Sequence, residues 1–446
     1  MTSPATSPPL ELIGAFESTY QPHHDIDVAE SSGHVAAWRA DLELARACGI
    51  RKLRYPVRWH RVEACEGRYD WSATDRVFDH MRECGLEPIV DLVHHTSYPR
   101  WLRDGFADPR FGPAFLRYVE AFAARTPWIR EYTLFNEPLA TLLLCGHEGV
   151  WPPYGRGMDS FTRLLKNVLP ALAAATRLLA EMLPGARHVY VDTCEQHTGE
   201  GSAGTAYARY ANDRRFFALD ALLGRADDGS GRPFVDDVVA HGGASLLRIE
   251  PGVVDVVGLD YYAHCQWHFA EPPRVPSPRP VPLSTLIGTY AGRYGRPCML
   301  SETNVRGFPS DRATWLKYTL EQCEIAVASG VRLEGYCWFP LVDSCDWDSL
   351  LFHADGNLDP VGVFSVDAER RRHPSPMSVS YALAAAGTPA AELPAYRLRE
   401  PVRSWLTGYA PQMSGWSWQD PPPDESVAVG VPGDPVYRPL SIRQVA

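Results

Sequence analysis

The sequence repeats one local pattern, in which an amphipathic stretch ends at a glycine and a short apolar run follows. The pattern occurs at Gly49, Gly85 and Gly330. Glycine readily adopts the left-handed conformation that closes many helices, and the apolar runs have the length of a buried strand. Helices and strands that alternate in this order predict βα units around a parallel sheet.

Eight segments have the length and composition of strands, and helical segments separate them. The predicted strands are 12–16, 51–57, 88–93, 132–135, 188–192, 254–260, 298–301 and 333–338. The predicted helices are 34–48, 72–84, 113–125, 160–182, 205–223, 284–294, 313–329 and 377–387. Eight such units predict the α/β class and a (β/α)8 TIM barrel with enlarged βα loops.

A doubly wound open sheet would give a similar alternation of elements. It should carry a glycine-rich phosphate-binding turn after its first strand, but the segment 14–18 has no G-x-G-x-x-G pattern. We therefore assign residues 1–388 to a barrel. Residues 389–446 are rich in Pro, Ser and Trp and lack periodicity, which predicts an extended C-terminal tail packed on the barrel or on a partner subunit. The sequence leaves open whether the chain forms a homo-oligomer.

Composition excludes several classes of function. The formal net charge of −11 argues against a nucleic-acid partner, which would need clustered cations. The sequence contains no run of about 18 apolar residues, so it predicts no membrane span. The N-terminus lacks the features of a secretory signal, so we expect a cytoplasmic protein. The 10 cysteines are scattered without a C-x-x-C pair, which argues against a zinc site. We expect neither a metal nor a cofactor.

Two glutamates stand where predicted strands end. Glu137 follows the fourth strand within Thr133–Pro138, and Glu302 follows the seventh within Met299–Asn304. Active sites of (β/α)8 barrels lie at the C-terminal ends of the strands, so both carboxylates should face one pocket. Such a pair can cleave a glycosidic bond, because one carboxyl group protonates the leaving oxygen and the other attacks the anomeric carbon.

The same rim carries other polar residues. Arg54 and Tyr262 are candidates to keep Glu302 charged, since a nearby cation or donor stabilises a carboxylate. The pair His94-His95 does not predict a metal site, because adjacent strand residues point to opposite faces. We expect one histidine to recognise a sugar hydroxyl and the other to pack outward.

Taken together, these strand-end motifs resemble glycoside hydrolase family 1, the β-glucosidase family of retaining (β/α)8 enzymes. The resemblance spans most of residues 11–385 in a divergent form. The family's motifs Y-R-F-S-x-x-W-S-R-I, L-x-H-W, T-F-N-E-P, G-Y-x-x-G-x-x-A-P, G-I-N-Y-Y, T-E-N-G and D-N-F-E-W are similar to segments 53–62, 92–95, 133–138, 146–153, 258–262, 301–304 and 343–347.

The resemblance implies a role for each matched residue. Glu137 would be the acid/base and Glu302 the nucleophile of a double displacement. The residues implied to bind the sugar, or to hold the nucleophile, are Arg54, His94, Asn136, Tyr262, Trp338, Asp346 and Trp347. At the first strand, either Glu17 or Gln21 could take the place of the family's glutamine.

Several positions depart from the family's pattern. Asp346 replaces a glutamate, Asp260 replaces an asparagine and His95 replaces a tryptophan. These changes leave the cleavage machinery intact and bear on the choice of sugar. The acidic segment 348–355 has no counterpart of the family's phosphate-binding residues, so phosphorylated sugars are not expected.

The sequence therefore predicts a retaining β-glycosidase that acts on a small-molecule glycoside or oligosaccharide. Two alternatives remain at this point. A transglycosidase would use the same carboxylates with another hydroxyl in place of water. A non-catalytic carbohydrate-binding barrel would keep the fold without the chemistry.

Overall fold

The computed structural model describes residues 10–227, 231–270, 275–423 and 425. Eight parallel strands close into a barrel, and each pairs with the next in chain order until β13 pairs with β1. They are β1 (Glu11–Ala15), β4 (Lys52–Pro56), β5 (Glu87–Asp91), β6 (Glu131–Thr133), β7 (Arg187–Thr193), β9 (Val256–Asp260), β12 (Cys298–Glu302) and β13 (Leu333–Trp338). The predicted (β/α)8 barrel is confirmed, and all eight predicted strands belong to it.

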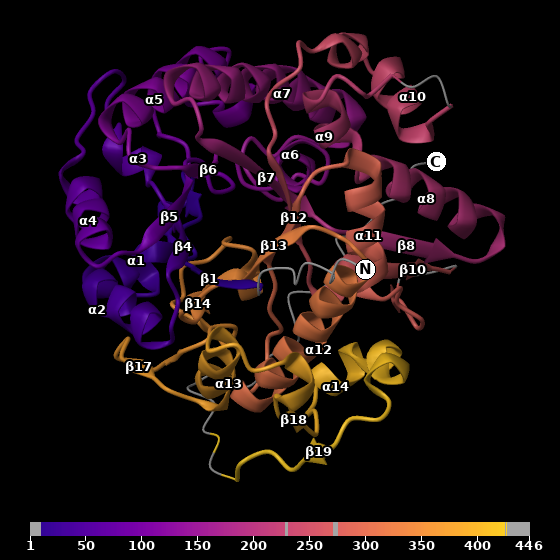
Figure 1. The fold of residues 1–446 in the computed structure, drawn as a ribbon. Helices are drawn as coiled ribbons and strands as arrows, with labels where there is room; N and C mark the ends of the chain where they lie inside the picture. The colour runs from indigo at the N-terminus through magenta and orange to yellow at the C-terminus, as the bar shows by residue number, and fades with distance from the viewer. Residues whose placement is uncertain (1–9, 228–230, 271–274, 424, 426–446) are drawn as a thin grey trace, which may run out of the picture.

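Helices surround the barrel (Figure 1). The long ones are α2 (His34–Ala47), α4 (Ser72–Glu83), α5 (Phe111–Arg125), α7 (Gly157–Met182), α11 (Leu283–Tyr294), α12 (Pro309–Ala328) and α13 (Pro376–Ala385). The predicted helix 205–223 is two helices, α8 (Gly201–Arg214) and α9 (Phe217–Leu222), because the chain turns at Arg215 and Phe216. Shorter helices are α1 (Val28–Ser31), α3 (Trp59–Val62), α6 (Pro138–Gly146), α10 (Pro233–Ala240) and α14 (Val402–Trp405).

Short strand pairs decorate the loops outside the barrel. They are formed by β2 (Tyr20–Gln21) with β3 (Ile26–Asp27), β14 (Ser344–Cys345) with β15 (Leu358–Asp359), and β16 (Ser365–Val366) with β17 (Arg372–His373). A small sheet joins β8 (Gln196–Gly199), β10 (Gln266–Phe269) and β11 (Val275–Pro276). Most of these additions follow barrel strands, so they enlarge the βα side of the molecule.

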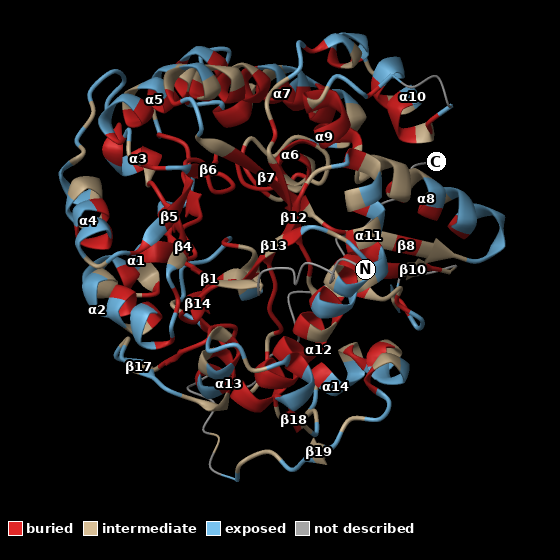
Figure 2. Ribbon diagram, in the orientation of Figure 1, coloured by how far each residue is buried: buried red, intermediate tan, exposed pale blue. Residues whose placement is uncertain are grey.

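The core has two parts. One cluster unites buried side chains from six barrel strands, which is expected where strands face one another across a barrel axis; its members include Ile13, Ile89, Val189, Val256, Met299 and Cys337. The larger part lies between the strands and the inner faces of the helices. Figure 2 shows that the barrel strands are largely buried and that the surrounding helices are exposed on their outer faces.

The described part of the C-terminal segment (residues 389–423 and 425) forms short elements, some of which pack along α12. It contains β18 (Ala395–Tyr396), α14 and β19 (Trp418–Gln419). Lys317 of α12 donates from Nζ to the carbonyls of Ala390 and Ala391 at 2.7 Å each. Further along, Tyr409 shares a 2.8 Å hydroxyl–hydroxyl hydrogen bond with Tyr261, which directly follows β9. Residue 424 and residues 426–446 of the predicted tail lie outside the described residues.

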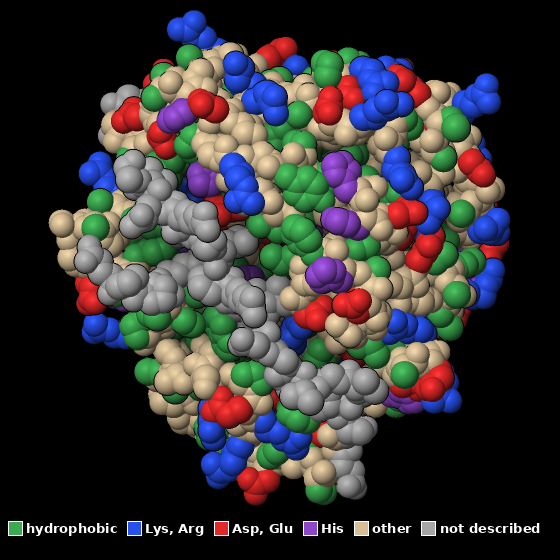
Figure 3. Space-filling view, turned by 180° about the vertical axis from the view of Figure 1, so that it is seen from behind, with side chains coloured by type: hydrophobic (Ala, Val, Ile, Leu, Met, Phe, Trp, Pro, Cys, Tyr) green, Lys and Arg blue, Asp and Glu red, His purple; other side chains and the backbone are tan. Residues whose placement is uncertain are grey.

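The surface carries mixed charge. Figure 3 shows acidic and basic side chains interspersed around the outline of one face of the molecule. Among the described residues, no helix is both long and apolar enough to cross a bilayer.

Candidate active site

The two predicted glutamates meet in one cavity at the C-terminal ends of the barrel strands. Glu302 is the last residue of β12, and Glu137 lies between β6 and α6. Both line a cavity of about 300 Å³. A third carboxyl group, that of Asp260 at the end of β9, lies beside them, and one oxygen from each of the three lies within 4.8 Å of the others. The barrel thus brings together residues that are far apart in the sequence.

Glu302 is held by two donors from other strand ends. Arg54 of β4 donates from Nη1 to Oε1 of Glu302, and Tyr262 donates from its hydroxyl to Oε2 at 2.6 Å. Arg54 also forms an ion pair with Asp91 of β5 at 2.9 Å and donates to the side-chain oxygen of Asn136. Both oxygens of Glu302 therefore accept a hydrogen bond, one of them from a buried cation.

Glu137 has a different environment. It is 7% exposed, and among the described residues no lysine or arginine forms an ion pair with its carboxyl group. Burial raises the pKa of Glu137 well above its usual range, and the charges of Asp260 and Glu302 raise this pKa further. Its backbone is left-handed, with φ of 43°, an unfavourable conformation for a glutamate, and it directly precedes Pro138, the first residue of α6. The two glutamates are thus suited to different protonation states.

The side chains of Asn136 and His95 connect Arg54 with Glu137. The side-chain nitrogen of Asn136 lies 3.3 Å from Nε2 of His95, which is itself 3.9 Å from Glu137. The expectation that one histidine packs outward is wrong, because β5 ends at Asp91 and His95 turns with φ of 49°. His95 consequently lines the cavity, while His94 lies beside it with Nδ1 2.8 Å from Asp91.

The structure separates the two candidates that follow the first strand. Glu17 lines the cavity, and its Oε1 accepts hydrogen bonds from the backbone nitrogens of Ser18 and Thr19 at 2.8 and 2.7 Å. Gln21 is 1% exposed in β2 and is not among the lining residues. Nε2 of His94 lies 3.5 Å from Oε1 of Glu17.

The residues predicted around the eighth strand differ in their access to the cavity. Trp347 lines it and packs against the rings of His95 and Trp151 at centroid distances of 5.8 and 5.9 Å. Trp338 is fully buried and donates its indole N–H to the carbonyl of Val361 at 2.8 Å. Asp346 is also buried, and its Oδ1 accepts from the backbone nitrogen of Asn357 at 3.0 Å. Neither Trp338 nor Asp346 belongs to the lining.

Sequence reasoning missed some residues of the site. Asp91 was visible as a strand-end carboxylate, but nothing in the sequence indicated its ion pair with Arg54. Trp151 belongs to a loop whose path only the fold determines. Apolar side chains of α6 also line the cavity, namely Leu139, Ala140, Leu143 and Leu144. Their helical spacing could have predicted one shared face, but not that this face meets the cavity.

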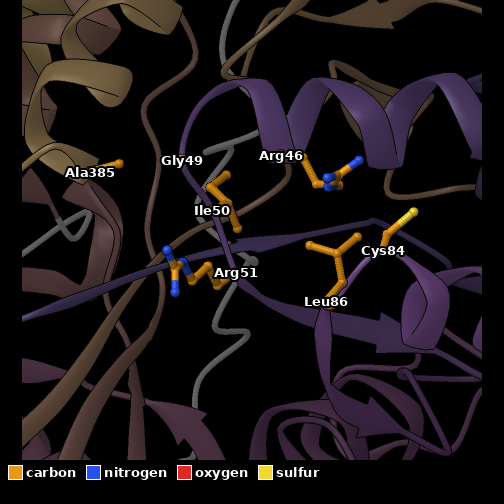
Figure 4. Close-up of a pocket in the computed structure, with 8 residues that line it drawn as sticks. Arg46, Gly49, Ile50, Arg51, Cys84, Leu86 and Ala385 are labelled. Atoms are coloured by element: carbon orange, nitrogen blue, oxygen red, sulfur yellow. The ribbon is translucent and has the colours of Figure 1, made fainter.

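A second cavity of about 530 Å³ lies at the opposite end of the barrel (Figure 4). It is lined by residues of the loops that precede β4 and β5, among them Arg51 and Leu86, together with Arg46 and Cys84 from helix ends. None of its lining residues is a carboxylate. In barrels of this type, the end that precedes the strands serves stability rather than chemistry, so the candidate active site is the smaller cavity.

Comparisons with known proteins agree with this geometry. The sequence profile described as "Glycosyl hydrolase family 1" matches residues 15–201, which include Glu137 but stop before Glu302. "Beta-glucosidase A" of Thermotoga maritima is 26% identical over 382 residues, which cover 75% of this chain and 82% of that protein. "Thermostable beta-glucosidase B" of Thermobispora bispora is 24% identical over 366 residues, with coverages of 73% and 75%.

A solved structure extends the likeness in fold. The β-glucosidase from Thermotoga maritima in complex with deoxynojirimycin superimposes with a TM-score of 0.71 at 17% sequence identity. The superposition covers 86% of this chain and 99% of that one.

Proposed function

We propose that the chain is a β-glucosidase-like glycoside hydrolase, similar to the enzymes of family 1, and that it is a retaining β-glycosidase. Its substrates would be small-molecule β-glycosides or oligosaccharides. The reaction would pass through a covalent glycosyl-enzyme, with Glu302 as the nucleophile and Glu137 as the acid and base.

The separation of the two carboxyl groups carries this proposal. An oxygen of Glu137 and an oxygen of Glu302 lie within 4.8 Å of each other. Retaining enzymes hold their carboxyl groups about 5 to 5.5 Å apart, whereas inverting enzymes need about 6.5 to 9.5 Å to seat a water molecule between base and sugar. The short separation supports direct attack by Glu302.

In the first step, an oxygen of Glu302 would form a bond to the anomeric carbon. The glycosidic carbon–oxygen bond breaks, its electron pair stays on the leaving oxygen, and Glu137 gives that oxygen a proton. Arg54 and Tyr262 stabilise Glu302 as an anion before the attack, because both donate to its oxygens. Burial raises the pKa of Glu137 and keeps it protonated for its part in this step.

In the second step, Glu137 has lost its proton and would act as a base. It removes a proton from a water molecule whose oxygen attacks the anomeric carbon. The bond to Glu302 breaks, and the carboxylate is restored with the sugar released in its original configuration. Glu302 becomes a neutral ester in the intermediate, which removes one negative charge beside Glu137 and favours its new role.

The remaining predicted residues would bind the sugar. We propose that Asn136 holds the 2-hydroxyl group, whose contacts strengthen in the transition state. Glu17, His94 and Trp347 would contact other hydroxyls or the ring, since Glu17 and Trp347 line the cavity and His94 adjoins Glu17. Gln21, Trp338 and Asp346 are buried and are not among the residues that line the cavity, so we propose that they act by supporting the lining.

The two alternatives have less support. A transglycosidase would use the same carboxylates, but the relatives described above carry the names of β-glucosidases. A non-catalytic barrel would not need a nucleophile held by Arg54 and Tyr262 or an acid with a raised pKa.

The E302Q variant tests the proposed roles. We expect its kcat on an aryl β-glycoside to fall by a factor on the order of 10⁴ or more, because loss of a nucleophile removes the covalent route. The exposed residue Glu369 supplies a matched control, and E369Q should keep wild-type turnover. Near-normal activity of E302Q would refute the assignment.

A further inference from the structure

We propose that Asp260 is a further positioning residue of this reaction, which acts on Glu137 through its charge. The charge of Asp260 would keep Glu137 protonated up to a higher pH than the charge of Glu302 alone would. This inference rests on the proposed function and concerns a residue that departs from the asparagine of the family's motif.

The position of Asp260 supports this role. It is the last residue of β9 and is 0% exposed. Its Oδ1 accepts a hydrogen bond from the hydroxyl of Ser301 at 2.6 Å, which fixes the carboxyl group beside β12. One of its oxygens lies within 4.8 Å of an oxygen of Glu137 and of an oxygen of Glu302. Three acidic groups thus share one buried space.

The charges around this space leave the carboxyl groups short of cations. The titratable groups that act on Asp260 or lie against it from the surrounding elements are Arg54, Glu137, Asp192, Cys194, Tyr262, Cys265, Glu302 and Cys337. Among these described groups only Arg54 is a cation, and it already forms ion pairs with Glu302 and Asp91. Buried anions that lack a partner are costly, so Asp260 and Glu137 compete for protons.

One oxygen of Asp260 is free for this interaction. Oδ2 is buried and has no hydrogen-bond partner among the described residues, whereas Oδ1 is taken by Ser301. Burial raises the pKa of Asp260 well above its usual range, and the charge of Glu302 adds to the effect. Asp260 and Glu137 therefore titrate as a pair, and ionisation of one opposes ionisation of the other.

The consequence for catalysis has a definite sign. Once Asp260 is ionised, a negative charge close to Glu137 makes loss of the Glu137 proton harder, and the charge of Asp260 contributes to the raised pKa of Glu137. The high-pH side of the activity profile follows loss of that proton. An asparagine at position 260 would supply no such charge, so it would leave Glu137 with a lower pKa.

The test compares pH profiles of kcat/KM for the wild type, D260N and D260E. We expect D260N to move the high-pH limb toward lower pH by about one unit or more, and D260E to restore it. The shift should appear with an alkyl β-glycoside, whose departure requires a proton from Glu137. It should be absent at the glycosylation step of a dinitrophenyl glycoside, whose leaving group departs without that proton. A structural role would alter both substrates alike.

A second measurement gives an answer even if D260N turns over slowly. Carbon-13 titration of the glutamate carboxyl groups, assigned with E137Q, should show a lower pKa for Glu137 in D260N than in the wild type. An unchanged pKa and an unchanged limb would overturn the proposal. An inactive wild type would instead refute the proposed function, so the two failures can be told apart.

Discussion

At the scale of single residues, the two catalytic candidates could be predicted because each follows an apolar strand. What the sequence could not supply was their surroundings. Asp260 stood out only as a substitution within a motif, although it lies within 4.8 Å of both glutamates. One residue of the pair His94-His95 was expected to pack outward, but a left-handed turn at His95 aims its side chain into the cavity. Alternation along a strand fails once the strand has ended.

The raised pKa of Glu137 also predicts a cost in stability. At pH values above 4.5, the ordinary pKa of a glutamate, the folded protein keeps the proton on Glu137, whereas the unfolded chain releases it. The folded state therefore binds more protons, and the free energy of unfolding falls as pH rises from about 4.5 toward the folded-state pKa. The E137Q variant has no titratable group at this position. We therefore expect its free energy of unfolding to be higher than that of the wild type at pH 7 and no higher at pH 4. Urea unfolding at both pH values measures this, and equal differences at both would contradict the expectation.

At the scale of elements, the order of strands and helices was predictable because each glycine-ended helix precedes an apolar strand. The predicted helix 205–223 was wrong in detail, since the chain turns at Arg215 and Phe216 between α8 and α9. The role of α6 was not predicted. This helix begins directly after Glu137, the proposed acid, and its Leu139 and Leu143, four residues apart, both line the cavity. We therefore expect them to contact the leaving group, which would receive its proton from Glu137.

An apolar helix face at that place predicts a preference for apolar leaving groups. We expect L143Q to raise KM for a nitrophenyl β-glycoside by about tenfold, because a polar side chain weakens burial of the ring. The methyl β-glycoside of the same sugar is the matched control, since it places little surface against α6, and its KM should change little. Equal effects on both substrates would show that Leu143 does not contact the leaving group.

At the scale of the whole molecule, the closed barrel explains why residues 137 and 302 meet. Parallel strands with helices between them must expose all their C-terminal ends on one face. The C-terminal segment shows the limit of sequence reasoning. Its lack of periodicity predicted an extended tail packed on the barrel or on a partner subunit, but not the short elements of residues 389–423 or their polar contacts with Lys317 and Tyr261. Such contacts depend on partners distant in the sequence.

The configuration of the first product tests the central claim most directly. Proton NMR during hydrolysis of an aryl β-glycoside distinguishes the two anomers before the free sugar mutarotates. The short separation of Glu137 and Glu302 predicts that the β-anomer appears first and the α-anomer follows slowly. Initial release of the α-anomer would mean inversion by a single displacement, and it would contradict the assignment of Glu302 as the nucleophile.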